Sequence, residues 1–287
     1  MSDNSRGSSQ GNSQGNSQGS SQGNSRGSSE GNSQGYPKGF ALVIGGSGGV
    51  GEAICRELVA SGVPLMLSYN SNQGRAEALV SELGCDDIGV SCCRISLQEI
   101  DTLKAAVDEG LKHHGRLHSV FIATGYDIPQ SPISEVTPEL WQRVMRSDAE
   151  GAFNAIYATL PHLRAGGGGS YLHISSAGLL KYPPLDILSV APKAAVEELI
   201  KGVAKEEGVN GIRANSIAIG VIETGIFLRL KEQGVFDDAW IDTVKNALPL
   251  QRFGQPEEVA KMAVFLASNH AAYTTGQLIP VDGGFGV

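Results

Sequence analysis

The feature that most constrains the fold is the alternation of short apolar runs with longer helical patterns from residue 40 onward. Each apolar run is continuous, as in Phe40–Ile44, which is typical of a strand buried on both faces. Helical periodicity lies between the runs, for example over 50–60 and about 138–163. Such an alternation predicts a parallel sheet with right-handed crossovers, that is, a doubly wound, Rossmann-like α/β fold. The other predicted strands are 65–69, 89–93, 119–123, 170–174, 213–218 and 277–281.

The first 37 residues differ from the rest of the chain. A four-residue unit of Gly, Ser or Asn, Ser and mostly Gln repeats seven times between Gly7 and Gln34. Such a segment buries no apolar surface that could offset an ordering entropy of about 1–2 kcal/mol per residue. We therefore expect a disordered, hydrophilic tail over residues 1–37 and a single domain over residues 38–287. The tail lacks the apolar stretch of a secretory signal.

Charge and cysteine usage exclude several classes of protein. The formal net charge of −8 argues against a nucleic-acid partner, which would require a basic face. No apolar run approaches the ~20 residues that a membrane span needs. The four cysteines have no metal-binding spacing, and adjacent Cys92 and Cys93 point to opposite faces of a predicted strand. Reduced thiols of this kind are typical of a cytoplasmic protein.

A glycine-rich loop connects the first predicted strand to the first predicted helix. Gly45, Gly49 and Gly51 allow a tight turn there and a close approach of phosphate groups to backbone N–H groups at the helix N-terminus. The setting of strand, loop and helix predicts a dinucleotide site at the carboxyl end of the first strand.

A second pattern lies further along the chain. Ser176 is followed after thirteen residues by Ser189 and after four more by Lys193. With the glycine loop and the closing stretches 249–260 and 276–284, this pattern resembles the short-chain dehydrogenase/reductase family. The likeness extends from residue 40 to the end and is strongest to single-domain members such as the β-ketoacyl and enoyl carrier-protein reductases. It implies a nicotinamide dinucleotide, a small-molecule substrate and a homotetramer.

The resemblance also implies which residues would contact the cofactor, although several positions depart from the family pattern. Ile44 stands where Thr is usual, Arg94 replaces an Asp before Ile95, and Ile122 begins a variant of an Asn-Asn-Ala-Gly motif. The residues implied are Gly45, Ser47, Gly49, Val50, Gly51, Asn70, Ser71, Ile95, Ala123, Gly125, Lys193, Ile222 and Thr224.

The second strand predicts the choice of nucleotide. An NAD-specific site places a carboxylate at its end for the ribose 2′-OH, but Tyr69 stands there, with no acid in the next five residues and Arg75 nearby. We therefore expect NADP(H) to be favoured over NAD(H). Arg75 is equally consistent with a solvated helix charge.

The reaction site departs most from the family. There, a Ser orients the substrate carbonyl, a Tyr protonates its oxygen, a Lys binds the ribose and an Asn continues the proton relay. By register these positions are Ser176, Ser189, Lys193 and Asp148. Serine is far less acidic than a phenol of pKa about 10, so Ser189 is not expected to be the donor itself.

Two other positions were considered for a proton donor. Carrier-protein enoyl reductases place their Tyr seven residues before the Lys, and Asp186 stands there instead. Tyr182 lies six residues after Ser176 on the loop that walls the substrate pocket in the family. It is a candidate donor or, alternatively, part of the pocket wall.

These observations predict a nicotinamide-dependent oxidoreductase with an atypical site that reduces a carbonyl or conjugated enone, including an acyl thioester on a carrier. Two alternatives remain. One is a non-redox lyase, cyclase or isomerase on the same fold, and the other is a catalytically silent partner in a mixed oligomer.

Overall fold

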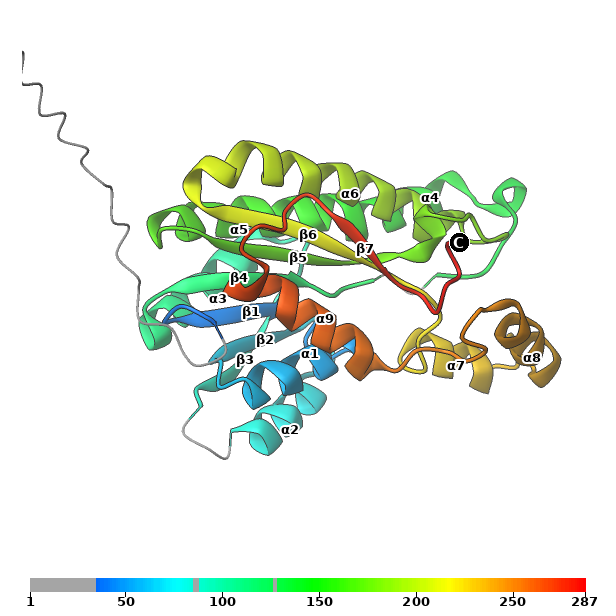
Figure 1. The fold of residues 1–287 in the computed structure, drawn as a ribbon, viewed down its shortest axis with the longest axis horizontal. Coiled ribbons are helices and arrows are strands. Elements are labelled where there is room, and N and C mark those ends of the chain that lie inside the picture. Colours follow the sequence, from blue (N-terminus) through cyan, green and yellow to red (C-terminus); the bar gives the residue numbers. More distant parts are fainter. Residues whose placement is uncertain (1–34, 85–87, 126–127) are drawn as a thin grey trace, which may run out of the picture.

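The computed structural model describes residues 35–84, 88–125 and 128–287. Within these residues one seven-stranded sheet runs through the molecule in the order β3-β2-β1-β4-β5-β6-β7, and every pairing is parallel (Figure 1). The strands are β1 (Phe40–Ile44), β2 (Leu65–Tyr69), β3 (Val90–Arg94), β4 (Leu117–Ile122), β5 (Gly169–Ser176), β6 (Ile212–Ile219) and β7 (Leu278–Val281). This confirms the predicted doubly wound fold.

Helices cover both faces of the sheet (Figure 1). Helices α1 and α9 pack together on one face, and α3, α5 and α6 pack on the other. The helices are α1 (Gly49–Ala60), α2 (Gln73–Leu83), α3 (Ile100–His114), α4 (Pro138–Met145), α5 (Gly151–Ala165), α6 (Ile187–Glu207), α7 (Ile226–Glu232), α8 (Asp238–Ala247) and α9 (Pro256–Ala267). The long helix predicted over about 138–163 is α4 and α5 joined by a π-helical turn at Arg146–Glu150.

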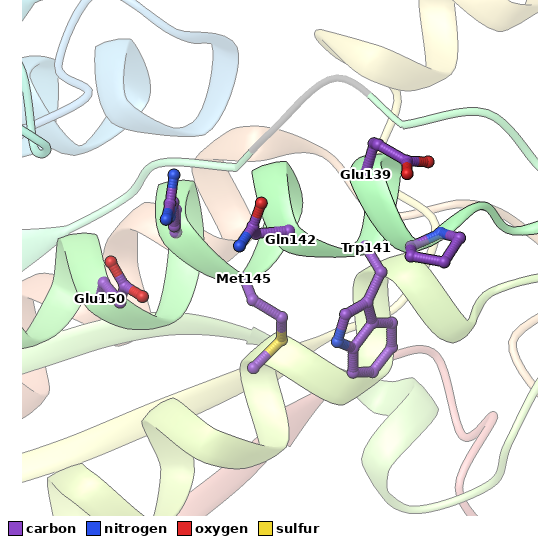
Figure 2. A pocket seen from close by; sticks show the side chains of 7 residues that line it. Glu139, Trp141, Gln142, Met145 and Glu150 are labelled. Atoms are coloured by element: carbon purple, nitrogen blue, oxygen red, sulfur yellow. The ribbon is translucent and has the colours of Figure 1, made fainter.

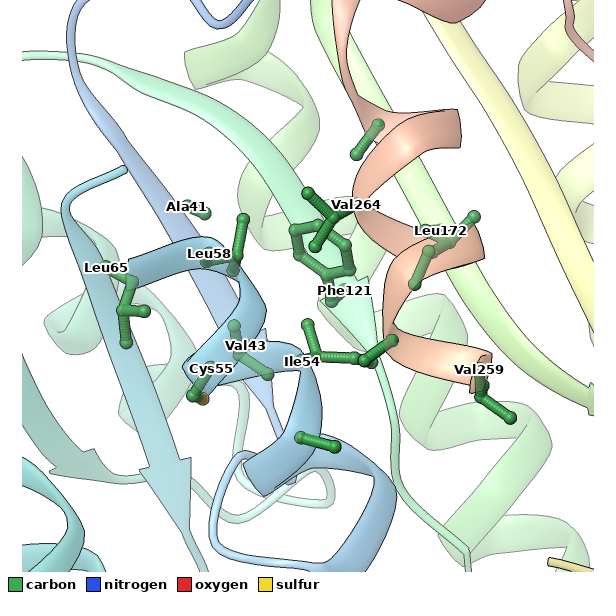
Figure 3. Packing of buried hydrophobic residues seen from close by; sticks show 14 of the residues in the cluster. Ala41, Val43, Ile54, Cys55, Leu58, Leu65, Phe121, Leu172, Val259 and Val264 are labelled. Carbon is green, nitrogen blue, oxygen red and sulfur yellow. The ribbon is translucent and has the colours of Figure 1, made fainter. Parts of the chain in front are cut away.

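The two layers explain why the first apolar run is continuous. Ala41 and Val43 of β1 face the cluster formed with α1 and α9, whereas Phe40, Leu42 and Ile44 face the cluster formed with α3, α5 and α6. Successive side chains of a strand point to opposite faces, so both sets must be apolar. Figure 3 shows the first cluster, with side chains of β1, β2, α1, β4, β5 and α9 closing on one another.

The folded domain begins earlier than the sequence indicated. Tyr36, assigned above to the tail, is 1% exposed and packs in the first cluster. Its hydroxyl donates to the Val264 carbonyl at 2.6 Å, and the Asn269 N–H donates to the Gly35 carbonyl at 2.9 Å. The domain therefore begins at Gly35 and not, as expected, at residue 38. The reason is that the aromatic side chain of Tyr36 packs in the apolar core. The rest of the predicted tail, residues 1–34, lies outside the described residues.

Candidate active site

The glycine-rich loop is fastened to the sheet by β2. The Gly45 N–H donates to Ser68 Oγ at 3.0 Å, and the Ser47 N–H donates to the Ser68 carbonyl at 3.3 Å. Gly45 has φ +81°, a left-handed conformation that favours glycine. The loop turns sharply out of β1, and α1 begins at Gly49.

Glycine is required at the start of α1 by close contacts. A Cβ on Gly49 would lie 2.0 Å from Thr224 Oγ1, and one on Gly51 would lie 2.1 Å from the Gly45 carbonyl oxygen. Thr224, from the loop after β6, therefore packs directly on the glycine loop. Two parts of the predicted cofactor site that lie far apart in the chain therefore meet at one surface.

The same surface fits the phosphates of a dinucleotide. The first N–H groups of a helix have no acceptor within the helix, and Gly48, at the N-cap of α1, brings no side chain to cap them. Across the switch point, Ala123 follows β4 with its N–H on the Ile44 carbonyl at 2.9 Å. A Cβ added to the nearby Gly125 would meet no described atom within 4 Å. The loop thus offers donors and open space for an anionic ligand.

On the adenosine side, two arginines flank the end of β2. Asn70 and Ser71 follow this strand and are exposed. Arg94 is the register partner of Tyr69 on β3. Arg75 is bound to Glu52, with Nη2 3.0 Å from Oε2.

Glu52 and Ile95 complete this side of the site. Burial raises the pKa of Glu52, but hydrogen bonds from Arg56 and Arg75 outweigh that effect and leave the pKa below its usual value. Glu52 therefore stays ionised and holds Arg75.

The Ile95 side chain is buried, and its N–H donates to the Tyr69 carbonyl at 2.9 Å. On the opposite side, Ile222 is buried and its carbonyl accepts from the Thr224 N–H at 2.7 Å.

Helix α6 carries the central residues of the reaction site. Ser189 and Lys193 lie one turn apart, with Lys193 Nζ 3.4 Å from Ser189 Oγ. Ser176 ends β5, and its Oγ accepts from the Gly178 N–H at 3.0 Å, which leaves its own hydroxyl proton for another acceptor. Asp148 lies half-buried in the π-helical turn, which packs against α6.

Tyr182 lies on the loop between β5 and α6. Its side chain is 54% exposed, and its hydroxyl makes no hydrogen bond within the part of the chain that the structure describes. The C-terminal segment contacts the same loop, since Lys181 Nζ lies 5.5 Å from the centre of the Phe285 ring.

Asp186 is the site residue whose role sequence reasoning missed. It is the N-cap residue of α6, yet its side chain does not cap the helix. Its Oδ1 lies 3.4 Å from Gln130 Nε2. Burial raises the pKa of Asp186, partly opposed by the Gln130 hydrogen bond, the charge of Lys193 and the Ser189 hydroxyl. The available signal was spacing, because residues three and seven positions apart share a helix face.

His173, on β5, does not compete as an acid. Burial, together with the nearby charge of Lys193, lowers its pKa to about 3. The ring is therefore neutral near neutral pH and is part of the core.

A groove of about 470 Å³ follows α4 and the π-helical turn. Trp141 and Met145 point to one side of α4 (Figure 2). None of the predicted site residues lines it. Its lining residues are Pro138, Glu139, Trp141, Gln142, Met145, Arg146 and Glu150.

Among the described residues, no helix is both long and apolar enough to cross a membrane, and no group of His, Cys, Asp and Glu side chains could hold a metal ion.

Comparison with known proteins identifies the family. Residues 45–286 match the family model described as Enoyl-(Acyl carrier protein) reductase. The chain belongs to the short-chain dehydrogenase/reductase family. A short-chain type dehydrogenase/reductase from Mycobacterium ulcerans superimposes with a TM-score of 0.81 at 31% identity, covering 86% of this chain and 89% of that chain.

Curated relatives of this short-chain reductase agree. It is 30% identical over 249 residues to a tropinone reductase homolog of Arabidopsis thaliana, covering 86% of this chain and 92% of the relative. It is 29% identical over 244 residues to the 3-oxoacyl-acyl-carrier-protein reductase FabG of Staphylococcus aureus, covering 85% and 96%. The expectation of a nicotinamide-dependent carbonyl reductase is thereby confirmed.

Proposed function

We propose that this short-chain reductase uses NADP(H) to reduce a carbonyl or conjugated enone carried on an acyl thioester. The observation that carries the proposal is the approach of Lys193 Nζ to Ser189 Oγ at 3.4 Å, on a helix that follows Ser176. The description of the matching family model and the name of the Staphylococcus aureus relative support acyl groups on a carrier protein as the substrate class.

The chain's own residues then have distinct roles. The bound cofactor supplies the hydride. The glycine loop and the first turn of α1 bind its phosphates, and Ser47, Val50, Ala123, Ile222 and Thr224 shape the same surface. Lys193 binds the nicotinamide ribose. Ser176 and Tyr182 donate hydrogen bonds from their hydroxyl groups to the substrate oxygen, Tyr182 from its loop when substrate is present.

Hydroxyl donors at the substrate oxygen suit a substrate on which reduction leaves negative charge on that oxygen. Hydride addition to the β-carbon of an enone, or to a β-keto group, leaves negative charge on oxygen, and preorganised hydroxyl donors stabilise such charge. Asp148 continues the relay towards solvent from the turn beside α6. We further propose a homotetramer in the cytoplasm.

The choice of NADP(H) rests on the end of β2. No carboxylate follows Tyr69 there that would repel a 2′-phosphate, and Arg94 lies beside Tyr69 in register. Arg75 is held by Glu52 at 3.0 Å, whereas Arg94 forms only a longer ion pair with Glu99, with Nη2 3.9 Å from Oε1, so Arg94 is the better candidate.

Cofactor titration tests the proposal. Protein-enhanced fluorescence of NADPH and NADH measures both affinities, and acetoacetyl-CoA and crotonyl-CoA report reduction of the two thioester types. Lys193→Met should weaken NADPH binding and lower kcat by roughly 10²-fold. Lys201→Met is the matched control, because that exposed lysine on the same helix pairs with Glu198 at 2.7 Å. Absence of binding to either nucleotide by the unaltered protein would overturn the proposal.

A non-redox reaction is the second candidate. The observation that favours it is Ser189 beside Lys193 without a phenol, since that hydroxyl is a weak acid. Hydration of crotonyl-CoA without any nicotinamide cofactor would support this reading over reduction.

A further inference from the structure

We propose that the carboxyl group of Asp186 is the proton source for the reduced substrate oxygen, acting through the hydroxyl of Ser189. This inference rests on the proposed function and adds to it the acid that replaces the missing phenol.

The helix geometry brings the three residues together. Asp186, Ser189 and Lys193 are three and seven positions apart at the start of α6, which places them on one face of the helix. The Ser189 N–H donates to the Asp186 carbonyl at 3.0 Å. That bond fixes the first turn of the helix. The Ser189 hydroxyl is also a hydrogen-bond partner of the Asp186 carboxyl group, and its Oγ lies 3.4 Å from Lys193 Nζ.

The carboxyl group faces the loop after β4 instead of capping its helix. An N-cap Asp ordinarily accepts from the N–H of the second or third helical residue, but Asp186 makes no such bond. Its Oδ1 instead lies 3.4 Å from Nε2 of Gln130, on the loop after β4. The group is thus held between two elements of the site.

The backbone before Asp186 is strained. Leu185 has φ +67°, and Gln251 is the other non-glycine residue with positive φ within the described residues. The Leu185 carbonyl is held by the Ser131 N–H at 3.3 Å. Strain of this kind persists only where surrounding structure enforces it, and it concentrates at functional sites. Here it sets the direction of the next side chain, Asp186.

The surroundings of Asp186 favour its protonated form, which is the form that a proton donor needs. Burial raises the pKa of Asp186, while the Gln130 hydrogen bond, Lys193 and Ser189 partly oppose the rise. Lys193 is the charged group that acts on this carboxyl within the described residues, and Gln130 faces it from the other packed element. An acid is most effective when its pKa lies near the working pH.

The proton balance closes without a further reactant. A bound cofactor would supply the hydride for the new C–H bond, and the substrate oxygen would take up the electron pair. Ser189 gives its hydroxyl proton to that oxygen and receives the proton of Asp186, whose O–H bond breaks. The resulting carboxylate lies beside the Lys193 ammonium and recovers a proton from solvent.

The decisive variant is Asp186→Asn, which keeps the shape of the side chain and removes its acidic proton. We expect kcat for thioester reduction to fall by roughly 10²-fold and its pH dependence on the alkaline side to flatten, with the NADPH affinity changed less than about twofold. Asp186→Glu should keep the pH dependence. Asp101→Asn, the same change on the exposed first turn of α3, is the matched control.

Two further measurements guard against a merely structural effect. In the cofactor-free protein, the infrared band of a protonated carboxyl should titrate above the ordinary range of Asp and vanish in Asp186→Asn. Adding Ser189→Tyr to Asp186→Asn should restore turnover, because a phenol then supplies the proton. If Asp186→Asn keeps the rate and pH profile of the unaltered protein, the inference is overturned and the reductase proposal stands. If the unaltered protein binds no nicotinamide nucleotide, the proposed function fails and the inference fails with it.

Discussion

In the proposed function, single side chains at the end of β2 decide between NADP(H) and NAD(H). Tyr69 lies at the strand end with Arg94 beside it in register, and Arg75 is held by Glu52 at 3.0 Å. Because the 2′-phosphate of NADP carries negative charge, a carboxylate at the strand end would repel it, whereas the ribose 2′-OH of NAD would donate a hydrogen bond to that carboxylate.

We predict that Tyr69→Asp shifts the preference from NADPH towards NADH. The ratio of the two dissociation constants should change at least tenfold, about 1.4 kcal/mol, when measured by fluorescence titration. Tyr273→Asp, at a fully exposed tyrosine, is the matched control and should leave the ratio unchanged. An unaltered protein that already binds NADH ten times more tightly than NADPH would contradict the expected preference.

Residue spacing alone predicted part of the reaction site. The interval from Ser189 to Lys193 is one helical turn, so their approach follows from sequence, and the structure brings them to 3.4 Å. The sequence pattern marks position 186 for a tyrosine and therefore does not reveal a role for the carboxyl group of Asp186. Its surroundings depend on Gln130, 56 residues away in the chain, and on the left-handed turn at Leu185, neither of which a local pattern contains.

At the scale of elements, helix α6 contributes its first turns to the candidate active site and its following turns to the buried core. Its first turns carry Ser189 and Lys193, and one turn later Glu197 is 4% exposed, with neither carboxylate oxygen satisfied by a described residue. Burial raises the pKa of Glu197, and the nearby Ser216 hydroxyl, which forms no hydrogen bond of normal geometry with it, and the charge of Lys201 oppose that rise only in part. A carboxylate in this position costs stability when it is ionised.

We predict that Glu197→Gln stabilises the protein at neutral pH. The folded-state pKa lies above the unfolded value of about 4.3, so the folded state binds the proton more tightly. Stability is therefore fully present below the unfolded pKa and falls as pH rises through the folded pKa. Urea unfolding from pH 4 to pH 8 should find this decline in the unaltered protein and a weaker decline in Glu197→Gln. Glu198→Gln, at the exposed partner of Lys201, should keep the decline, and an equal decline in Glu197→Gln would exclude this explanation.

Elements were predicted where their signal is local. The run Phe40–Ile44 coincides with β1, and the other predicted strands overlap the observed ones, because buried strands need continuous apolar side chains. Helices α7 and α8 were not anticipated. They are short, and they pack in an aromatic cluster of Phe227, Phe236, Trp240 and Phe253. The contact of Phe227 with Phe253 joins α7 to the segment before α9, and no local pattern contains that contact.

At the scale of the whole molecule, the chain enters the fold away from the candidate active site. The Tyr36 ring lies 5.4 Å from that of His118, at the start of β4, and its hydroxyl is bound to α9. The glycine loop, Ser176 and Lys193 lie towards the carboxyl ends of the strands, the opposite edge of the sheet (Figure 1). The repeat segment is therefore expected to be dispensable for both stability and cofactor binding, whereas Tyr36 is not.

Two truncations test this distinction. Deleting residues 1–34 should leave the melting temperature and NADPH affinity unchanged. Deleting residues 1–36 removes a buried aromatic ring and should cost roughly 3–5 kcal/mol, or about 10 °C at 2–4 °C per kcal/mol for a domain of this size. In the full chain, Tyr36→Ala should reproduce that loss, and Tyr36→Phe should lose only about 1 kcal/mol because it deletes one hydrogen bond. Equal melting temperatures for the two truncations would mean that Tyr36 contributes nothing and that the domain starts at residue 38. A large drop already on deleting 1–34 would mean that the repeat segment itself packs on the domain.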